Sequence, residues 1–317
     1  MERSLNLTKA NKPRAAIDLG TNTFHLLIGT VGPDAQISVL HQQRWAVQLG
    51  KGGLAEGRIL HEAFLRAIDA CQQMAAIILQ HGVELSNVRA AGTSAIRNAK
   101  NGIDLVAAIQ SITGIKVQIL SGQQEAMGIF DGVKASGAIP TNAKTLVLDI
   151  GGGSVEFIFC HGLAARPPAF HSLEIGGQRM LERFMATDPI GRPAVEALRL
   201  WLRQELALLQ PAFRAFQPTV LVGASGTFDT LRDVLAAEVG AHNTVPYSEI
   251  PLDFMATFGQ QMRLANHTER LAIPGMVPLR ADMIVVAMVL IEEVLALAPI
   301  ARVVGSSYAL REGLLLG

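Results

Sequence analysis

Residues 146–159 read LVLDIGGGSVEFIF: an apolar run, a glycine-rich turn and a second apolar run. This order predicts a buried strand, a tight turn and a neighbouring strand. Gly151, Gly152 and Gly153 let the backbone approach a ligand and aim N–H groups at it, because no Cβ intervenes and a positive φ costs little. We interpret the turn as an anion cradle, with Asp149 placed at the end of the first strand to hold a metal ion or a water molecule.

A second hairpin near the N-terminus repeats this design. Residues 17–23 read IDLGTNT and align without a gap with residues 148–154, LDIGGGS. Apolar stretches precede and follow both turns. The chain therefore looks like two copies of one domain. A chance match between two short hairpins is the alternative, and the shared Asp, Gly and terminal hydroxyl positions weigh against it.

Length and composition favour two globular domains. The chain has 317 residues, and because a domain usually holds ~150 residues, two are expected. Half of the residues are hydrophobic and 17% are charged, which allows substantial cores and argues against disorder. With 27 basic and 27 acidic residues the formal net charge is zero, so we expect neither a DNA-binding nor a membrane-seeking surface.

Targeting, membrane and disulfide signals are weak. Residues 1–13 lack the apolar core of a signal peptide, which indicates a cytoplasmic protein. The most apolar segment, 283–300, has nine uninterrupted apolar residues before Glu292, and it is better explained as a buried helix than as a membrane span. Cys71 and Cys160 lie in apolar runs without a partner at metal-ligand spacing, so we predict core cysteines and neither a disulfide nor a zinc site.

Three further junctions place polar groups where helices begin. Residues 92–97, GTSAIR, follow a short strand, and a helix capped by Thr93 or Ser94 would offer its N-terminus to an anion. An ordinary capped helix with a surface arginine is the alternative for this motif. Residues 121–130 predict a helix with a glutamate in its first turn, which is catalytic only if that turn faces a cleft. Residues 220–227, VLVGASGT, again predict a strand, a glycine turn and a helix.

Two common phosphate-binding motifs are absent from the sequence. The Gly50-Lys51 pair is followed by glycine and lacks the upstream glycine of a P-loop. The triple glycine is followed by a strand instead of a helix, which excludes a dinucleotide-binding fingerprint. What remains is a pair of Asp-ended hairpins, one per domain, that would face each other across a cleft and offer N–H and hydroxyl donors to phosphate oxygens.

The paired hairpins resemble the phosphate turns of the actin-like ATPase superfamily, with residues 223–227 as the nucleotide-side turn. Seven motifs narrow that resemblance to the exopolyphosphatase and guanosine pentaphosphate phosphatase family. In chain order they are IDLGTNT (17–23), GTSAIR (92–97), SGQQEA (121–126), DIGGGSVE (149–156), ASGT (224–227), RAD (280–282) and LREG (310–313). Each motif is weak alone, but the ordered set spans nearly the whole chain and is specific.

The resemblance, which is to the short, two-domain members of the family, implies an α/β fold with two ribonuclease-H-like domains and an active-site cleft between them. We expect the first domain at residues 1–127 plus 302–317, closed by the C-terminal helix, and the second at 128–301. The implied activity is Mg²⁺-dependent hydrolysis, with Mg²⁺ or another divalent cation, of a terminal phosphoanhydride in polyphosphate or guanosine pentaphosphate. The protein partner considered is a second copy of the chain, in a homodimer.

The family pattern also implies roles for individual residues. Glu125 corresponds to the general base that activates water, Arg97 to the cation on the scissile phosphate, and Asp149 and Glu156 to metal-associated carboxylates. The implied phosphate contacts are Asp18, Gly20, Thr21, Asn22, Thr23, Thr93, Ser94, Gly151, Gly152, Gly153, Ser154, Gly226, Thr227 and Arg280. These roles fit the chemistry, because hydrolysis of an anhydride needs a positioned water and neutralised oxygens more than a covalent nucleophile.

Several positions depart from the family pattern. Gln124 precedes Glu125 where two acidic residues are common, which leaves one candidate base. Val155 stands where a threonine is usual, and one donor is lost there. Gln48 and Lys51 stand where Arg and Glu are frequent, so contacts to the outer part of the substrate do not carry over from the family.

Two other functions stay open at this point. A kinase or acyl-phosphate enzyme of the same superfamily would need an adenosine pocket around residues 223–229. A sensor that binds polyphosphate or an alarmone without turnover would not need a base, and the retention of Glu125 with both hairpin aspartates argues against it.

Overall fold

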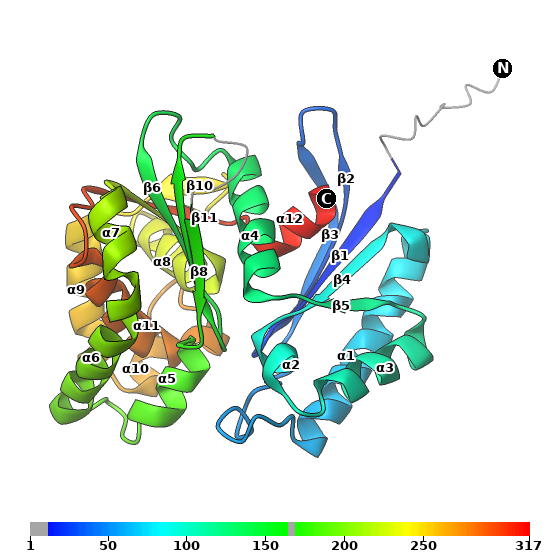
Figure 1. Cartoon of the computed structure of the whole chain (residues 1–317), viewed down its shortest axis with the longest axis horizontal. Coiled ribbons are helices and arrows are strands. Elements are labelled where there is room, and N and C mark those ends of the chain that lie inside the picture. The colour runs from blue at the N-terminus through cyan, green and yellow to red at the C-terminus, as the bar shows by residue number, and fades with distance from the viewer. Residues whose placement is uncertain (1–11, 164–168) are drawn as a thin grey trace. The chain divides into compact units, whose positions relative to one another are not determined.

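The computed structural model describes residues 12–163 and 169–317 (Figure 1). Contacts divide the chain into two compact units. Unit 1 comprises the residues up to Ser121 together with Leu310–Gly317, and unit 2 is Gly122–Ala309. Most of the N-terminal stretch on which the signal-peptide argument rests lies outside the described residues.

Both domain boundaries differ from those expected. A boundary after residue 127 would cut helix α4 (Gly122–Ser136), which is continuous. A boundary after residue 301 would remove strand β11 (Arg302–Ser306) from the sheet of unit 2, where it pairs on both sides. The chain instead leaves unit 1 before α4 and returns to it after residue 309, so the boundaries fall between elements.

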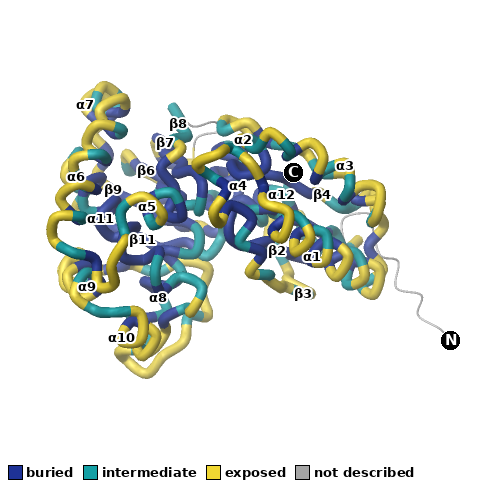
Figure 2. Tube along the Cα trace, turned by 90° about the horizontal axis from the view of Figure 1, so that it is seen from below, coloured by how far each residue is buried: buried dark blue, intermediate teal, exposed yellow. Residues whose placement is uncertain are grey.

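Unit 1 is built on a five-stranded sheet in the order β3-β2-β1-β4-β5. The first three strands form antiparallel pairs, and β4 and β5 continue the sheet parallel to β1. Their bounds are β1 (Arg14–Leu19), β2 (Phe24–Val31), β3 (Ile37–Trp45), β4 (Val88–Gly92) and β5 (Val117–Ile119). Edge strand β3 is mostly exposed, whereas β1 and β2 are mostly buried (Figure 2).

Helices cover both faces of this sheet. Alternate residues of a strand point to opposite faces, so Ile17 packs with Met74 of helix α1, whereas its neighbour Ala16 packs with Leu315 of helix α12. The helices of unit 1 are α1 (His61–Gln80), α2 (Ser94–Asn98), α3 (Gly102–Thr113) and α12 (Leu310–Leu316), with a short 3₁₀ turn at Leu85–Asn87. The C-terminal helix belongs to unit 1 and packs on one face of its sheet.

Unit 2 repeats the same sheet topology with one added strand. Its order is β10-β11-β9-β6-β7-β8, so β8-β7-β6-β9-β11 corresponds to β3-β2-β1-β4-β5 with the same strand directions. The bounds are β6 (Lys144–Ile150), β7 (Val155–His161), β8 (Ala169–Leu173), β9 (Val220–Ala224), β10 (Tyr247–Glu249) and β11. The predicted α/β fold with two ribonuclease-H-like sheets is confirmed.

The core of unit 2 lies on one face of its sheet. Leu148 and Phe157 pack there with Phe228 and Leu290, while α4 lies against β7 and β8. The helices are α5 (Gly177–Phe184), α6 (Arg192–Leu206), α7 (Gln210–Phe216), α8 (Ser225–Glu238), α9 (Leu252–Leu264), α10 (His267–Leu271) and α11 (Met283–Leu295), with 3₁₀ turns at Ala207–Leu209 and Pro278–Arg280.

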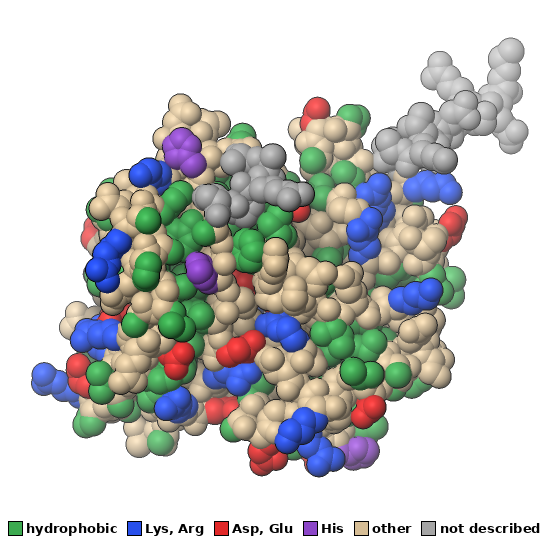
Figure 3. Space-filling view, in the orientation of Figure 1, with side chains coloured by type: hydrophobic (Ala, Val, Ile, Leu, Met, Phe, Trp, Pro, Cys, Tyr) green, Lys and Arg blue, Asp and Glu red, His purple; other side chains and the backbone are tan. Residues whose placement is uncertain are grey.

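Residues 283–295 of the apolar segment form α11, and nearly all side chains of this helix are buried. Among the described residues, no helix combines the length and the apolarity that crossing a membrane requires. Basic and acidic side chains are interspersed over the face shown in Figure 3, in keeping with the balanced charge of the sequence. The sequence analysis did not identify two short strands, β8 and β10.

Candidate functional site

The glycine turn of unit 2 joins β6 to β7, and each of these strands carries an acidic side chain next to the turn. We call residues 151–154 turn 2 and the corresponding residues 20–23 of unit 1 turn 1. Asp149 on β6 lies directly opposite Glu156 on β7. Both alternate away from the face where Leu148 and Phe157 pack, so they lie on the face that α4 covers. Both are buried.

Helix α4 brings Glu125 to these carboxylates. Gly122 begins the helix and contacts β8 so closely that a Cβ on it would lie 2.6 Å from the Cβ of Ser172. This close approach sets the first turn of α4 against the sheet and leaves Glu125 only 6% exposed. Glu125, Asp149 and Glu156 therefore form a buried cluster of carboxyl groups within unit 2.

The surroundings of Glu156 oppose the ionisation of its carboxyl group. Burial raises the pKa of the Glu156 carboxyl well above its usual value, and the negative charges of Glu125 and Asp149 raise that pKa further. Hydrogen bonds from Ser172 and Ser154 act in the opposite direction, the first running from Ser172 Oγ to Glu156 Oε1 at 2.7 Å. A cation placed here would relieve the mutual repulsion of the carboxylates.

The residues that begin α5 fix the orientation of turn 2. All three glycine carbonyls of the turn accept hydrogen bonds from this segment. The bonds are Gly177 N–H to Gly151 O (2.9 Å), Gln178 N–H to Gly152 O (2.9 Å), Gly176 N–H to Gly153 O (3.1 Å) and Arg179 Nε–H to Gly153 O (2.8 Å). The C=O and the following N–H of a trans peptide point in opposite directions. The N–H groups that follow these carbonyls therefore point away from α5, as an anion cradle requires.

The β9–α8 turn lies beside turn 2, because β9 runs parallel to β6. Ser225 Oγ donates a hydrogen bond to Ile150 O at 3.3 Å and links the two turns. The guanidinium of Arg280 lies on the backbone of Gly226, where a Cβ would meet its Nη2 at 2.2 Å. Thr227 is buried in the same turn. The predicted group of Gly226, Thr227 and Arg280 is thus brought together.

Turn 1 in unit 1 has the same register as turn 2. Asp18 lies opposite His25, and the gapless alignment of the two hairpins makes these residues the counterparts of Asp149 and Glu156. The hydroxyl of Thr23 is buried, and among the described residues it has no hydrogen-bond partner, so it is a donor that a ligand can use. Thr21 and Asn22 are also buried.

The GTSAIR motif lies next to turn 1, because β4 runs parallel to β1 and pairs Gly92 with Leu19. Thr93 N–H donates to Leu19 O at 3.4 Å. Thr93 occupies the N-cap position of α2, but its side chain makes no capping hydrogen bond, which differs from the expected role. Arg97 is half-buried, and its Nη1 donates to Leu120 O at 3.1 Å.

The predicted residues thus form two sets, one in each unit. Unit 1 gathers turn 1 with Thr93, Ser94 and Arg97, and unit 2 gathers turn 2 with Glu125, Glu156 and the Arg280 group. That the two sets face each other stays a prediction. Sequence reasoning did not select Ser172 or Arg179, although the paired glycines before Arg179 were a signal of close backbone packing.

Comparisons with known proteins agree with this arrangement. The family model described as the Ppx/GppA phosphatase family matches residues 28–317. A crystal structure of an exopolyphosphatase from Cytophaga hutchinsonii is 37% identical with a TM-score of 0.89, over 95% of this chain and 96% of that one. A crystal structure of the Aquifex aeolicus family member, 24% identical with a TM-score of 0.78 over 96% of each chain, shows the same fold.

Among curated proteins, the guanosine-5'-triphosphate,3'-diphosphate pyrophosphatase of Vibrio vulnificus is 30% identical over 301 residues. That match covers 95% of this chain but 58% of the relative's length. The family match reaches into both units and includes the motif of turn 2. The chain belongs to the Ppx/GppA phosphatase family.

Proposed function

We propose that this protein is a magnesium-dependent hydrolase that releases the terminal phosphate of inorganic polyphosphate or of guanosine pentaphosphate. The observation that carries the proposal is the burial of Glu125, Asp149 and Glu156 together beside turn 2 of unit 2. The names of its relatives point to the same two substrate classes, since one is an exopolyphosphatase and another a guanosine-5'-triphosphate,3'-diphosphate pyrophosphatase.

Glu125 is the proposed general base. It accepts a proton from a water molecule whose oxygen forms a new bond to the terminal phosphorus, while the bridging P–O bond breaks and its electron pair leaves with the shortened substrate. Within unit 2, the backbone N–H groups of turn 2 would donate hydrogen bonds to the phosphate oxygens, and Arg280 would offset their charge. No covalent intermediate on the protein is required.

The carboxylates of unit 2 fit a magnesium ion. Mg²⁺ prefers oxygen ligands and is usually held by one or two carboxylates together with water and substrate phosphates. Asp149 and Glu156 can supply that pair, since they lie opposite one another on neighbouring strands. Within residues 12–163 and 169–317, no group of three or more His, Cys, Asp or Glu side chains has the geometry to hold a metal alone. Asp149 and Glu156 would hold the ion, and its charge would offset that of the phosphate.

A kinase function is less well supported by the β9–α8 turn. Arg280 lies on the backbone of Gly226 and places a cation at this turn, which suits an anion better than an uncharged adenine. A sensor without turnover would gain nothing from burying Glu125, a group that costs free energy to bury.

The proposal is tested by measuring phosphate release from polyphosphate, guanosine pentaphosphate and ATP, with magnesium and with a chelator. We expect release from at least one of the first two and its loss with the chelator. Glu125→Gln should lower kcat about 10²- to 10⁴-fold, the contribution typical of a general base.

The matched control is Glu62→Gln, which changes an exposed glutamate in the first turn of α1 and should leave kcat unchanged. Full activity in Glu125→Gln would show that Glu125 is not the general base. Binding of polyphosphate or the alarmone without turnover would favour the sensor, and turnover of ATP with phosphate transfer to an acceptor would favour the kinase.

A further inference from the structure

Turn 2 is held by a backing segment, residues 176–179, that the catalytic proposal does not use. The turn presents its carbonyls to this segment and its N–H groups to the opposite side. Of the four hydrogen bonds between them, the one from Arg179 is the only one made by a side chain, and Gly153 O accepts it together with the N–H of Gly176. The Gly153 peptide is therefore the most strongly held of the three.

Arg179 is itself held in place. Its Nη2 donates to Glu174 Oε2 at 2.9 Å while its Nε donates to Gly153 O, so the guanidinium is fixed from two directions. A charged donor forms a stronger hydrogen bond than a neutral one, and it polarises the peptide that accepts it. The N–H of Ser154, which belongs to the same peptide as Gly153 O, becomes a better donor to an anion.

Gly176 allows this arrangement. A Cβ on Gly176 would lie 2.5 Å from the carbonyl carbon and oxygen of Gly152 and from the carbonyl carbon of Gly153. These are backbone atoms that cannot turn aside as the end of a side chain can. Turn 2 thus lies directly on the backing segment, and any movement of the segment would move the N–H groups of the turn.

Unit 1 contains a counterpart of the backing segment but without the arginine contact. Gly50 N–H donates to Thr21 O at 2.9 Å and Gln48 N–H donates to Asn22 O at 2.8 Å. These donors align with Gln178 and Gly176 at one common spacing along the chain, and Lys51 takes the position of Arg179. Backing by alternate N–H groups is therefore common to both turns, and among the contacts of the described residues the guanidinium bond is particular to turn 2.

We propose that Arg179 is a positioning residue that fixes the peptide of Gly153 so that turn 2 presents its N–H groups to the phosphate of the substrate. This inference rests on the proposed function, because it concerns how the phosphate turn of that same site is held. Arg179 acts through the backbone of the turn and does not touch the reacting atoms. Its loss should therefore weaken phosphate binding while the base and the carboxylates stay intact.

The test uses the full chain with Arg179→Gln, Arg179→Lys and the control Arg183→Gln. Arg183 lies one turn further along α5 and stacks on Trp201, with its guanidinium carbon 5.0 Å from the ring centre. We expect Arg179→Gln to raise the KM for tripolyphosphate about 10- to 100-fold. The lysine variant should recover part of this loss, because it restores the charge, and Arg183→Gln should leave KM within twofold.

Thermal unfolding and calorimetric binding of tripolyphosphate separate the possible outcomes. A KM that rises only in Arg179→Gln, with a Tm close to that of Arg183→Gln, supports the positioning role. An unchanged KM in Arg179→Gln, or a KM that rises equally in Arg183→Gln, overturns it. Should the unaltered protein hydrolyse nothing, the proposed function fails, and the calorimetric affinity of Arg179→Gln against the unaltered protein still decides the role of Arg179.

Discussion

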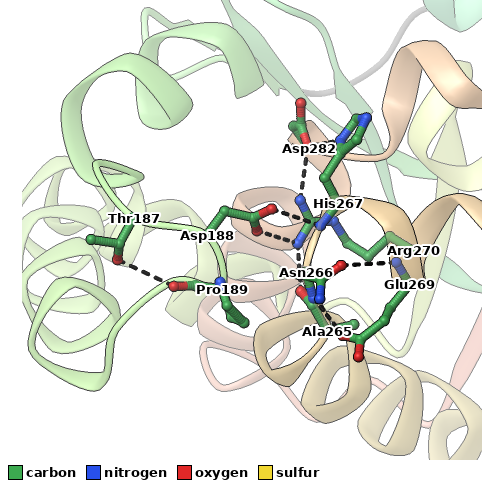
Figure 4. Close-up of polar contacts among 9 residues, drawn as sticks. All are labelled: Thr187, Asp188, Pro189, Ala265, Asn266, His267, Glu269, Arg270 and Asp282. Carbon is green, nitrogen blue, oxygen red and sulfur yellow. Dashed lines mark hydrogen bonds and ion pairs between the residues drawn. The ribbon is translucent and has the colours of Figure 1, made fainter.

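Arg270 illustrates what a single residue contributes to unit 2. Its side chain is fully buried and joins the loop before α6 to the start of α11 (Figure 4). Nη1 donates to Asp188 Oδ1 at 2.7 Å and Nη2 to Asp282 Oδ1 at 2.8 Å. His267 Nδ1 lies 2.7 Å from the same oxygen of Asp282. Because Asp282 follows Arg280 by two residues, the cluster also supports the segment that places Arg280 on Gly226.

The charge of Asp282 predicts a pH dependence of stability. Burial alone would raise the pKa of Asp282, but hydrogen bonds and charge from His267 and Arg270 outweigh burial and lower that pKa below the ordinary value of 3.8. A group whose pKa is lowered on folding stabilises the fold above its unfolded-state pKa, and this stabilisation is lost as the pH falls through the folded-state pKa.

We therefore expect the difference in unfolding free energy between the unaltered protein and Asp282→Asn to be constant near neutral pH. The difference should shrink as the pH falls below about 3.8, where the aspartate becomes protonated. Urea titrations across this pH range measure it. A difference that stays the same at every pH would show that the charge of Asp282 does not stabilise unit 2.

Single residues also show which parts of the candidate site can be predicted from the sequence. Glu125 and Asp149 could be selected because a motif and a strand end mark them, and the structure places them close together. Ser172 could not, because its hydrogen bond to Glu156 depends on the register of β7 with β8, and β8 was not recognised. The sequence indicates that Arg179 lies on a helix, but its contact with Gly153 depends on how turn 2 packs against α5.

At the scale of elements, substitutions at two glycines of the β9–α8 turn should have different effects, one on stability and one on function. Two of its glycines meet different neighbours. A Cβ on Gly223 would meet the buried ring of Phe228 at 2.0 Å, and one on Gly226 would meet the end of the Arg280 side chain at 2.2 Å. A buried ring held on all sides cannot move away, whereas the end of an arginine can.

Gly223→Ala should therefore lower the free energy of unfolding by about 1–3 kcal/mol or more, the usual cost of overpacking a core. Gly226→Ala should change stability little but displace Arg280 and raise the KM for the phosphorylated substrate several-fold. Denaturant titration and phosphate-release kinetics on both variants measure this contrast. Equal effects of the two substitutions on stability would contradict it.

Elements with a strong hydrophobic pattern were predicted correctly from the sequence, and short elements were not. α11 and the paired hairpins are as predicted, because burial imposes a pattern that a sequence displays. β8 and β10 are short edge strands, and edges carry little of the core pattern. The domain boundary was also not predicted correctly, because nothing in the local sequence of residues 121–127 indicates that α4 packs on β7 and β8 rather than in unit 1.

At the scale of the whole molecule, the two units share a design that extends beyond their turns. Sheet order and strand direction are preserved, and the two hairpins align without a gap. Each sheet also carries a helix over its acidic face, α12 in unit 1 and α4 in unit 2. The chemistry has diverged, since the position of Glu156 is taken by His25 in unit 1.

Unit 2 is one continuous segment with its own core, so it should fold alone. A fragment of residues 122–309 is expected to unfold in a single cooperative transition by circular dichroism.

A fragment of residues 12–121 lacks α12 and leaves Ala16 and Leu27 uncovered, so it should be markedly less stable and regain stability when a peptide of residues 310–317 is added. A 12–121 fragment as stable with the peptide as without it would contradict this reading of α12.

The return of the chain to unit 1 through α12 has a consequence for biosynthesis. A ribosome makes the sheet of unit 1 first, but residue 315, which covers one face of that sheet, is added only after all of unit 2 has been made. The apolar face of unit 1 that α12 covers therefore stays exposed while unit 2 is synthesised and folds. The half of the protein that is translated first is the half that matures last.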